Sequence, residues 1–313
     1  MTISVIVPVF NAKKTIKETI YSILNQTFKD IEVIVSDDCS TDSTLEIVKS
    51  ISDSRIKVIS NPTNTGVSET RNRGIAQAQG EYISFIDADD LWTPDKLESQ
   101  WQVLQNNPQA AVAYSWTDYI NAEGKFIKSG RRVIANGDIF TKLLQINFLE
   151  NGSNPLIRHK ALAEIGGFDK SLVAAEDKDM WLRLAANYEF VCVEKPQILY
   201  RQSKNSLSTN LKTMEDTSLK VIERAFKYAK AEKFQHLKRQ TISQMYQYLT
   251  FKAIEVPIEK RQPLTATYFL WNYMKNNSNL LTNKKLIAIA AFKILLPQLS
   301  QKITKRKKHN LNK

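Results

Sequence analysis

The sequence contains little cysteine and little histidine: two cysteines, Cys39 and Cys192, and three histidines occur in 313 residues. The cysteines lie far apart and form no C-x-x-C pair, so the sequence predicts no disulfide framework and favours a reducing compartment. Because the histidines are also scattered, no zinc site is predicted.

Long apolar runs and glycine-rich phosphate motifs are also absent. No stretch reaches about 18 apolar residues, so no membrane-spanning helix is predicted. The run Ile3–Val9 has no basic segment before it and is too short for a secretion signal. Neither G-x-G-x-x-G nor G-x-x-x-x-G-K-S/T occurs, which excludes the common dinucleotide and P-loop sites. A bound nucleotide would have to be held by side chains, with a metal ion at its phosphates.

Acidic residues are absent after Glu259, whereas residues 260–313 contain twelve lysines and arginines. The net charge of +12 therefore lies in this segment, and residues 1–259 are neutral overall. A neutral body argues against a nucleic-acid-binding protein, and a basic tail predicts contact with an anionic surface.

The first 120 residues alternate between short β-branched apolar runs and segments with apolar residues at helical spacing. The predicted strands are Ile3–Val9, Ile31–Val35, Ile56–Ile59 and Tyr82–Ile86. The predicted helices are Thr15–Leu24, one after Asp42, Val67–Ala78 and one that opens at Pro94. This alternation predicts an α/β fold with a mainly parallel sheet and helices on both faces.

The pattern changes along the rest of the chain. Further strands are predicted at Ala111–Thr117, Asn154–Arg158, Phe190–Val193 and Ile198–Tyr200, with a helix at Asp177–Ala186 and a polar loop over residues 118–137. After about residue 212 only helices are predicted: Thr213–Lys233, Phe234–Ala253, Pro263–Met274 and Lys284–Leu296. We therefore expect one domain over residues 1–210 and a helical extension over residues 211–313.

Ligands of an open α/β sheet bind beyond the carboxyl ends of its strands, where the strand order reverses. The loops predicted at those ends are Pro8–Asn11, Asp37–Ser40, Asn64–Gly66 and Asp87–Asp90. In the last of these, three carboxylates within four residues repel one another unless a cation lies among them. Hard oxygen ligands suit Mg²⁺ or Mn²⁺, which also bind phosphate oxygens. The alternative is an acidic turn that caps the following helix.

Two other carboxylate pairs are candidate site residues. Asp37-Asp38 closes a strand, where one carboxylate could accept the N–H of a uracil-type base or form an Asx-turn. Phe10 could stack on a base or belong to the core. Glu176-Asp177 precedes a helix, where it either caps the helix or supplies a general base for an acceptor hydroxyl.

The ordered series of these motifs resembles the family-2 glycosyltransferases, a large inverting family with the GT-A fold. The resemblance covers roughly residues 2–208. Within the family, the sequence resembles bacterial glycosyltransferases that build O-antigen and capsule. The matching pieces are Val5–Asn11, Ser22–Thr27, Glu32–Asp38, Thr65–Asn72, Phe85–Asp90, Gly166–Asp169, Glu176-Asp177 and Trp181–Arg183. The Q-x-x-R-W motif of processive synthases is absent, which favours single addition.

The resemblance implies a nucleotide-sugar half at about residues 1–117 and an acceptor half at about residues 118–210. Pro8 and Phe10 would line the base pocket. Asp38 would bind the base edge, with Arg71 nearby. Asp87 would meet the ribose.

The same resemblance implies the chemistry. Asp89 would ligate Mn²⁺ or Mg²⁺ on the diphosphate, and Asp177 would take the proton of the acceptor hydroxyl in a single inverting displacement. Asn11, Asp90 and Glu176 would support the site. The donor is expected to be a UDP-linked hexose or N-acetylhexosamine.

One loop departs from the family pattern. Many relatives carry Tyr-Arg-x-His after the last strand, where this chain has Tyr200-Arg201-Gln202-Ser203. Arg201 is still expected to reach the diphosphate, because an arginine fork suits phosphate oxygens.

The end of the chain predicts contact with a membrane. The apolar segment Leu286–Leu296 is too short to span a bilayer, and five basic residues follow it between Lys302 and Lys308. This pattern suits the anionic cytoplasmic face of a membrane, which predicts a cytoplasmic, peripheral protein whose glycan acceptor is linked to polyprenyl diphosphate. The alternative is a packing helix with a solvated tail.

Two other functions are compatible with the sequence. A nucleotidyltransferase also combines an α/β sheet with metal-binding carboxylates, but its phosphate loop usually contains glycine, which Asn11–Lys14 lacks. The second is a catalytically inactive scaffold of the same fold, against which the intact aspartates argue.

Overall fold

The computed structural model describes residues 2–202, 210–256, 258–277 and 283–299. The chain divides into two compact units, Met1–Thr209 and Asn210–Lys313. Ser203 and the polybasic run after Lys302, both considered above, lie outside the described residues.

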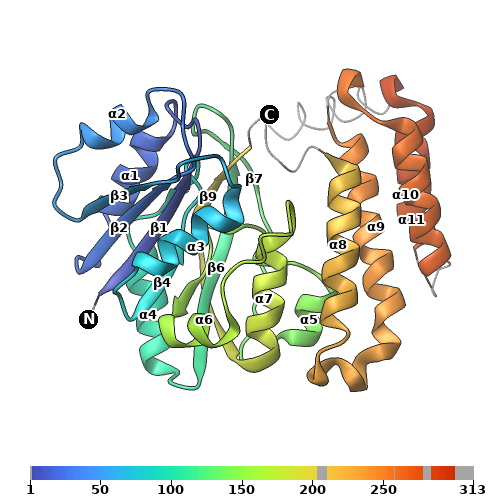
Figure 1. Ribbon diagram of the computed structural model, residues 1–313. Helices are drawn as coiled ribbons and strands as arrows, with labels where there is room; N and C mark the ends of the chain where they lie inside the picture. Colours follow the sequence, from blue (N-terminus) through green and yellow to red (C-terminus); the bar gives the residue numbers. More distant parts are fainter. Residues whose placement is uncertain (1, 203–209, 257, 278–282, 300–313) are drawn as a thin grey trace, which may run out of the picture. The chain divides into compact units, whose positions relative to one another are not determined.

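The first unit is built on four parallel strands, in the order β3-β2-β1-β4. They are β1 (Ile3–Val9), β2 (Ile31–Asp37), β3 (Ile56–Ser60) and β4 (Tyr82–Phe85), close to the predicted bounds. The chain steps outward from β1 to β3 and then returns to place β4 on the other side of β1 (Figure 1). The strand order therefore reverses at β1, where a ligand site is expected.

The other half of the sheet is mixed. Its strands are β5 (Leu91–Trp92), β6 (Ala110–Ile120), β7 (Phe126–Ser129), β8 (Leu156–Arg158) and β9 (Glu189–Arg201). β8 runs antiparallel to β4 and β6, β9 is parallel to β6, and β5 and β7 pair antiparallel with β9 and β6.

Two predictions for this half were wrong. The polar segment 118–137 contains β7, whose four residues are all exposed and so give no apolar alternation. The two strands predicted around Pro196 form one strand, β9, because a register shift opposite Trp116 accommodates the proline, which has no N–H to donate.

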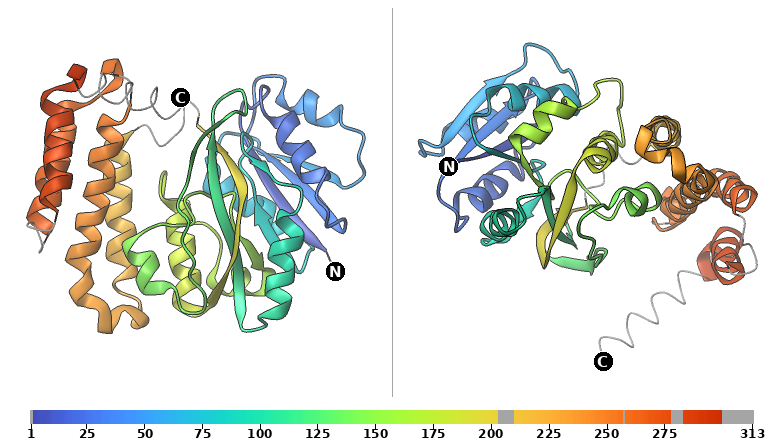
Figure 2. Two further views of the ribbon diagram at one scale, coloured as in Figure 1. Left: turned by 180° about the vertical axis from the view of Figure 1, so that it is seen from behind. Right: turned by 90° about the horizontal axis from the view of Figure 1, so that it is seen from below.

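Helices cover both faces of this sheet (Figure 2). They are α1 (Ile16–Leu24), α2 (Thr44–Lys49), α3 (Val67–Gln77), α4 (Lys96–Asn106), α5 (Phe140–Gln145), α6 (His159–Ile165) and α7 (Glu176–Asn187). Val5 and Val7 of β1 share a core with Ile20 of α1 and Leu97 of α4. On the opposite face, Ile6 lies so close to Gly74 of α3 that a Cβ there would be 2.4 Å from it. The short helices α5 and α6 were not predicted.

The second unit is helical. It contains α8 (Leu211–Ala225), α9 (Lys238–Ile254), α10 (Pro263–Asn276) and α11 (Lys284–Leu295), with 3-10 helices at Ala229–Leu237 and Ile258–Lys260. The helix predicted over Thr213–Lys233 ends early, at Ala225. The buried Glu215 of α8 accepts hydrogen bonds from Tyr246 of α9 (2.8 Å) and Tyr268 of α10 (3.0 Å), which ties three helices together. Among the described residues, no helix has both the length and the hydropathy to cross a membrane.

Candidate active site

Strained backbone marks the loops around the strand-order reversal. In the described part of the chain, four non-glycine residues have left-handed φ angles: Asn11 (51°), Cys39 (65°), Glu150 (70°) and Ala175 (59°). Asn11 and Cys39 follow β1 and β2, and Ala175 is the N-cap of α7. Such conformations cost free energy and concentrate at functional sites. The backbone therefore points to the same loops as the sequence motifs.

Asp38 lies at the carboxyl end of β2 with its carboxylate buried. Its Oδ1 accepts hydrogen bonds from the Thr65 N–H (2.8 Å) and from Asn61 Nδ2 (2.8 Å), and its Oδ2 accepts one from the Gly66 N–H (2.9 Å). Burial alone would raise the pKa of Asp38, but these hydrogen bonds outweigh burial and lower the pKa. Asp38 is thus an ionised acceptor at the end of a strand. The neighbouring Asp37 instead accepts from the Ser40 N–H, three residues on, and so fixes the loop after β2.

The loop after β1 exposes an aromatic ring. Pro8 is buried within the strand, whereas the Phe10 side chain is 50% exposed and does not belong to the core. Asn11 Oδ1 accepts hydrogen bonds from the backbone of Thr41 (2.8 Å) and Asp42 (3.3 Å), which fixes this loop to the one after β2. Phe10 is therefore available to stack on a planar group.

The three carboxylates after β4 have different surroundings. Asp90 is fully buried, and its carboxylate accepts hydrogen bonds from Ser153 Oγ (2.6 Å) and from the Arg201 N–H (2.9 Å). Burial and the charges of Asp89 and Asp87 raise the pKa of Asp90 well above its ordinary value. Asp90 therefore anchors the loop through both of its carboxylate oxygens.

Asp89 is the carboxylate of this loop that fits a cation. Burial and the charge of Asp87 raise the pKa of Asp89 to about 6. A divalent cation with a preference for hard oxygen ligands would relieve this repulsion. Within the described residues, no three His, Cys, Asp or Glu side chains are placed to hold a metal ion. The donor set therefore fits an ion shared between Asp89 and oxygens of a substrate, as expected for Mn²⁺ or Mg²⁺ on a diphosphate.

Arg201 is buried next to the acidic loop, and its guanidinium donates hydrogen bonds to the protein. Its side chain is 3% exposed. Its Nε donates to the Asp89 carbonyl (2.7 Å), its Nη1 to the Ala122 carbonyl (2.6 Å), and its Nη2 to Glu18 (2.8 Å). Each guanidinium nitrogen of Arg201 thus donates to the protein, and contact of Arg201 with the diphosphate stays a prediction. The residue fixes the backbone that carries Asp89.

Arg71 connects the loop after β4 to α7. Its Nη2 pairs with Asp87 (2.7 Å) and its Nη1 with Glu176 (2.8 Å), and its side chain is 3% exposed. Burial alone would lower the pKa of Arg71, but the two carboxylates raise it. Gly152 leaves room for this bridge, since a Cβ there would lie 2.9 Å from Nη2. The ion pairs of Arg71 are with Asp87 and Glu176 and not with Asp38.

Asp177 lies in the first turn of α7, one residue after Glu176. The N-cap is Ala175, and both carboxylates lie in the first turn of the helix, where the helix dipole stabilises negative charge. Burial and the charge of Glu176 raise the pKa of Asp177 to about 7, whereas Arg71 opposes the rise. A carboxylate that titrates near neutral pH is suited to accept a proton from a hydroxyl.

Two features that hold this site together were not assigned a role from the sequence. The Asn72 side chain exchanges two hydrogen bonds with the Phe168 backbone (2.7 and 2.8 Å), and Arg183 of α7 donates to the Gly167 carbonyl (2.9 Å). Gly167 is required here, because a Cβ would lie 2.3 Å from Asn72 Oδ1. The Gly166–Phe168 segment thus clamps α7 to α3.

Ser153 is the second such feature. Its hydroxyl accepts from the Asp87 N–H (3.0 Å) and donates to Asp90. Ser153 is separated from both aspartates by more than 60 residues, and no sequence motif marks it.

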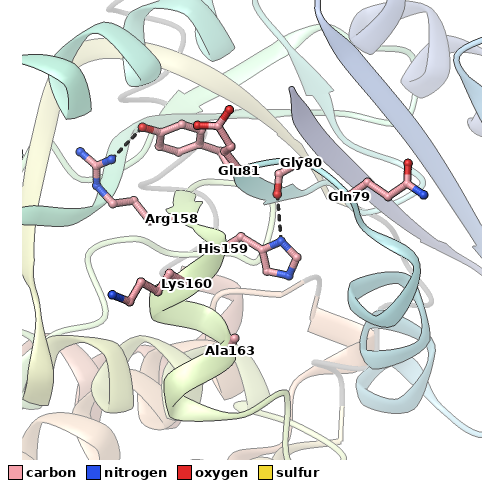
Figure 3. Close-up of a pocket in the computed structure, with 8 residues that line it drawn as sticks. Gln79, Gly80, Glu81, Arg158, His159, Lys160 and Ala163 are labelled. Carbon is pink, nitrogen blue, oxygen red and sulfur yellow. Dashed lines mark hydrogen bonds between the residues drawn. The ribbon is translucent and has the colours of Figure 1, made fainter. Parts of the chain in front are cut away.

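A pocket on this unit lies away from these residues (Figure 3). It is lined by Tyr82, Arg158, His159 and neighbouring residues. Tyr82 is the first residue of β4, whereas Asp87 follows the carboxyl end of that strand. The pocket therefore lies at the amino end of β4, and the acidic loop lies at its carboxyl end. Three of its polar side chains are already paired: Arg158 donates to Tyr82 (2.7 Å), and His159 bonds the Gly80 carbonyl (2.8 Å). We therefore assign the candidate site to the loops of Asp38, Asp89 and Asp177.

The chain matches known glycosyltransferases in sequence and in structure. Residues 4–253 match the family model described as glycosyltransferase like family 2. The chain is 32% identical over 218 residues to WfgD of Escherichia coli, named as a UDP-Glc:alpha-D-GlcNAc-diphosphoundecaprenol beta-1,3-glucosyltransferase, with 66% of this chain and 80% of that protein covered.

Two solved structures have a similar fold. One is TarS residues 1–349 from S. aureus in complex with UDP-GlcNAc, with a TM-score of 0.60, 18% identity, and 91% of this chain and 92% of that chain covered. The other is the mannosyltransferase PcManGT from Pyrobaculum calidifontis in complex with GDP-Man and Mn²⁺, with a TM-score of 0.55, 19% identity, and 95% and 87% covered.

The fold and the sequence match define a glycosyltransferase that acts on a sugar nucleotide. The chain belongs to the glycosyltransferase family 2-like proteins. The predicted glycosyltransferase activity and the GT-A fold are confirmed, and the nucleotidyltransferase alternative is set aside.

Proposed function

We propose that the chain transfers a hexose or N-acetylhexosamine from a UDP-linked donor to a hydroxyl of a lipid-linked glycan, with inversion at the anomeric carbon. The observation that carries the proposal is the Arg71 bridge. It joins Asp87, at the start of the acidic loop, to Glu176, the neighbour of Asp177. The buried guanidinium of Arg71 thus connects the donor side of the site to the helix that carries the proposed base.

Each side chain has a part in the proposed reaction. Phe10 stacks on the base, and Asp38 accepts its N–H. Asp89 would hold Mn²⁺ or Mg²⁺ at the donor diphosphate, and the ion would supply positive charge that stabilises the leaving group. Ionised Asp177 takes the proton of the acceptor hydroxyl while the acceptor oxygen bonds to the anomeric carbon and the bond from that carbon to the diphosphate breaks. A single displacement inverts the configuration and requires no covalent nucleophile.

The acceptor is proposed to be a glycan on polyprenyl diphosphate, used in the synthesis of a bacterial surface polysaccharide. The printed name of WfgD, which states a diphosphoundecaprenol-linked acceptor, supports this choice. The basic segment after Glu259 is compatible with it. On this proposal the protein works at the cytoplasmic face of a membrane as a peripheral enzyme.

The test is nucleoside diphosphate release from a panel of nucleotide sugars with Mn²⁺, with and without EDTA, in the presence of a lipid-diphosphate N-acetylglucosamine acceptor. We expect metal-dependent release from one UDP-sugar that is lost in Asp89→Ala and Asp177→Asn. The exposed turn residue Glu123 gives the matched control, Glu123→Gln, which should keep wild-type activity. Absence of release together with absence of UDP–Mn²⁺ binding by calorimetry would reject the enzyme and favour the inactive scaffold.

A further inference from the structure

Helix α10 of the second unit leaves an apolar stripe exposed to solvent. Leu264, Tyr268 and Trp271 are 88%, 47% and 64% exposed, and the exposed Lys275 continues the same spacing. Residues at i, i+4, i+7 and i+11 lie along one side of a helix. The opposite side, with Ala266, Phe269 and Tyr273, is buried within the unit. The helix is therefore apolar on its buried side and also along a stripe of its exposed side.

Helix α11 is apolar but almost unpacked. Its sequence, KKLIAIAAFKIL, contains nine apolar residues among twelve, yet within the described chain only Ala290 is buried. Ile289 is 42% exposed, Leu295 is 76% exposed, and Leu296, immediately after the helix, is 49% exposed. A monomeric soluble protein rarely leaves such helix faces uncovered, so these faces mark an interaction site.

Charge identifies the partner. The last turn of α10 carries the exposed Lys275, and the first turn of α11 carries the exposed Lys284 and Lys285. No acidic residue occurs after Glu259, and residues 260–313 contain twelve lysines and arginines. A second copy of this unit would bring the same positive charge against it, which disfavours self-association. A bilayer with anionic headgroups offers apolar depth for the helix faces and negative charge for the lysines.

We propose that Leu264 and Trp271 of α10, with the exposed residues of α11, form a docking face that inserts into the interface of an anionic lipid bilayer. The inference rests on the proposed function only for its purpose, which is to bring the enzyme to a lipid-linked acceptor. The face itself is defined by exposure and charge in this unit. Its test therefore uses neither donor nor acceptor.

Trp271 provides a direct probe. It is the only exposed one of the five tryptophans, all of which lie in the described part of the chain. With the full chain, we expect the Trp271 emission to shift to the blue on phosphatidylcholine vesicles with 30% phosphatidylglycerol, and to be quenched when the lipid tails are brominated. Vesicles of phosphatidylcholine alone should bind much more weakly.

Two pairs of variants separate the apolar and the electrostatic parts in co-sedimentation. Leu264→Ser with Trp271→Ser should lower the partition coefficient at least tenfold, whereas Phe126→Ser, at a 63%-exposed residue of the first unit, should not. Lys284→Gln with Lys285→Gln should lower it about thirtyfold on anionic vesicles. The exposed control pair Lys49→Gln with Lys160→Gln should lower it much less.

Two results would overturn the proposal. One is Trp271 emission that does not change on anionic vesicles. The other is a dimer in light scattering without lipid that Leu264→Ser with Trp271→Ser converts to a monomer, which would make the face an interface between two copies. Neither result would affect nucleoside diphosphate release in detergent, so failure of the docking face is distinguishable from failure of the proposed reaction.

Discussion

Replacement of Arg71 by methionine tests whether the buried bridge supports both the fold and the base. The guanidinium is 3% exposed and pairs with Asp87 at 2.7 Å and with Glu176 at 2.8 Å. Removal of one partner of a buried ion pair costs about 3–5 kcal/mol, because the remaining charge is left uncompensated. Asp87 is 30% exposed, so water would compensate part of its charge. We therefore expect a loss of about 3 kcal/mol in the free energy of unfolding.

The same change should alter the pH dependence of the reaction. The charge of Arg71 lowers the pKa of Asp177, which burial and Glu176 raise to about 7. Without Arg71 this pKa rises further. Because Asp177 must be ionised to accept a proton, the acid limb of kcat/KM against pH should move to higher pH.

The assays are urea unfolding and a pH profile of nucleoside diphosphate release. Arg73→Met is the matched control, since Arg73 lies on the same helix, is 40% exposed, and makes only a 3.6 Å pair with Glu69. An exposed pair of this kind contributes about 0–1 kcal/mol. Equal stability of Arg71→Met and Arg73→Met, or an unmoved acid limb, would refute the bridging role of Arg71.

Three other outcomes are expected. Asp177→Asn should abolish transfer and, in calorimetric scans, raise Tm at pH 8 but not at pH 4. The Asp177 carboxyl has a pKa raised from 3.8 to about 7, so its ionisation lowers the stability of the wild type as pH rises through that range. Equal Tm values for the wild type and Asp177→Asn at pH 8 would contradict this. Asp89→Asn should lose UDP–Mn²⁺ binding in calorimetry, whereas Asp90→Asn should keep Mn²⁺ affinity within about threefold, because Asp90 bonds Ser153 and Arg201 instead of the ion. Arg201→Gln should weaken UDP–Mn²⁺ binding about tenfold, because it loosens the loop that carries Asp89. Glu18→Gln removes only a 62%-exposed partner of Arg201 and should change the binding less than about twofold. Equal effects of the two variants would argue that Arg201 does not position the loop.

The parallel half of the fold could be predicted because its signals are local. β1, β2 and β4 are buried and mostly apolar, and the acidic loop and Glu176-Asp177 are short motifs at the ends of elements. Strand β7 could not be predicted, because all its residues are exposed. The continuity of β9 was hidden by Pro196, which is accommodated only through pairing with β6.

The roles of neighbouring carboxylates could not be read from residue type. Asp89 and Asp90 are adjacent and identical, yet only Asp90 is paired with Ser153, a residue 63 positions away. In the same way, the residue type alone does not reveal that Arg201 pairs with Glu18 and Arg71 with Glu176, each more than 100 positions away. Sequence motifs locate the site, whereas long-range packing decides which side chain faces a ligand.

The most direct test of the central claim is the stereochemistry of transfer by the wild type and by Asp177→Asn. An α-linked UDP-sugar and a lipid-diphosphate N-acetylglucosamine acceptor are incubated with Mn²⁺, and the anomeric configuration of the product is read from its proton coupling constant by NMR. Inverting transfer with Asp177 as base predicts a β-linked product from the wild type and none from Asp177→Asn. An α-linked product, or an unchanged rate in Asp177→Asn, would contradict it.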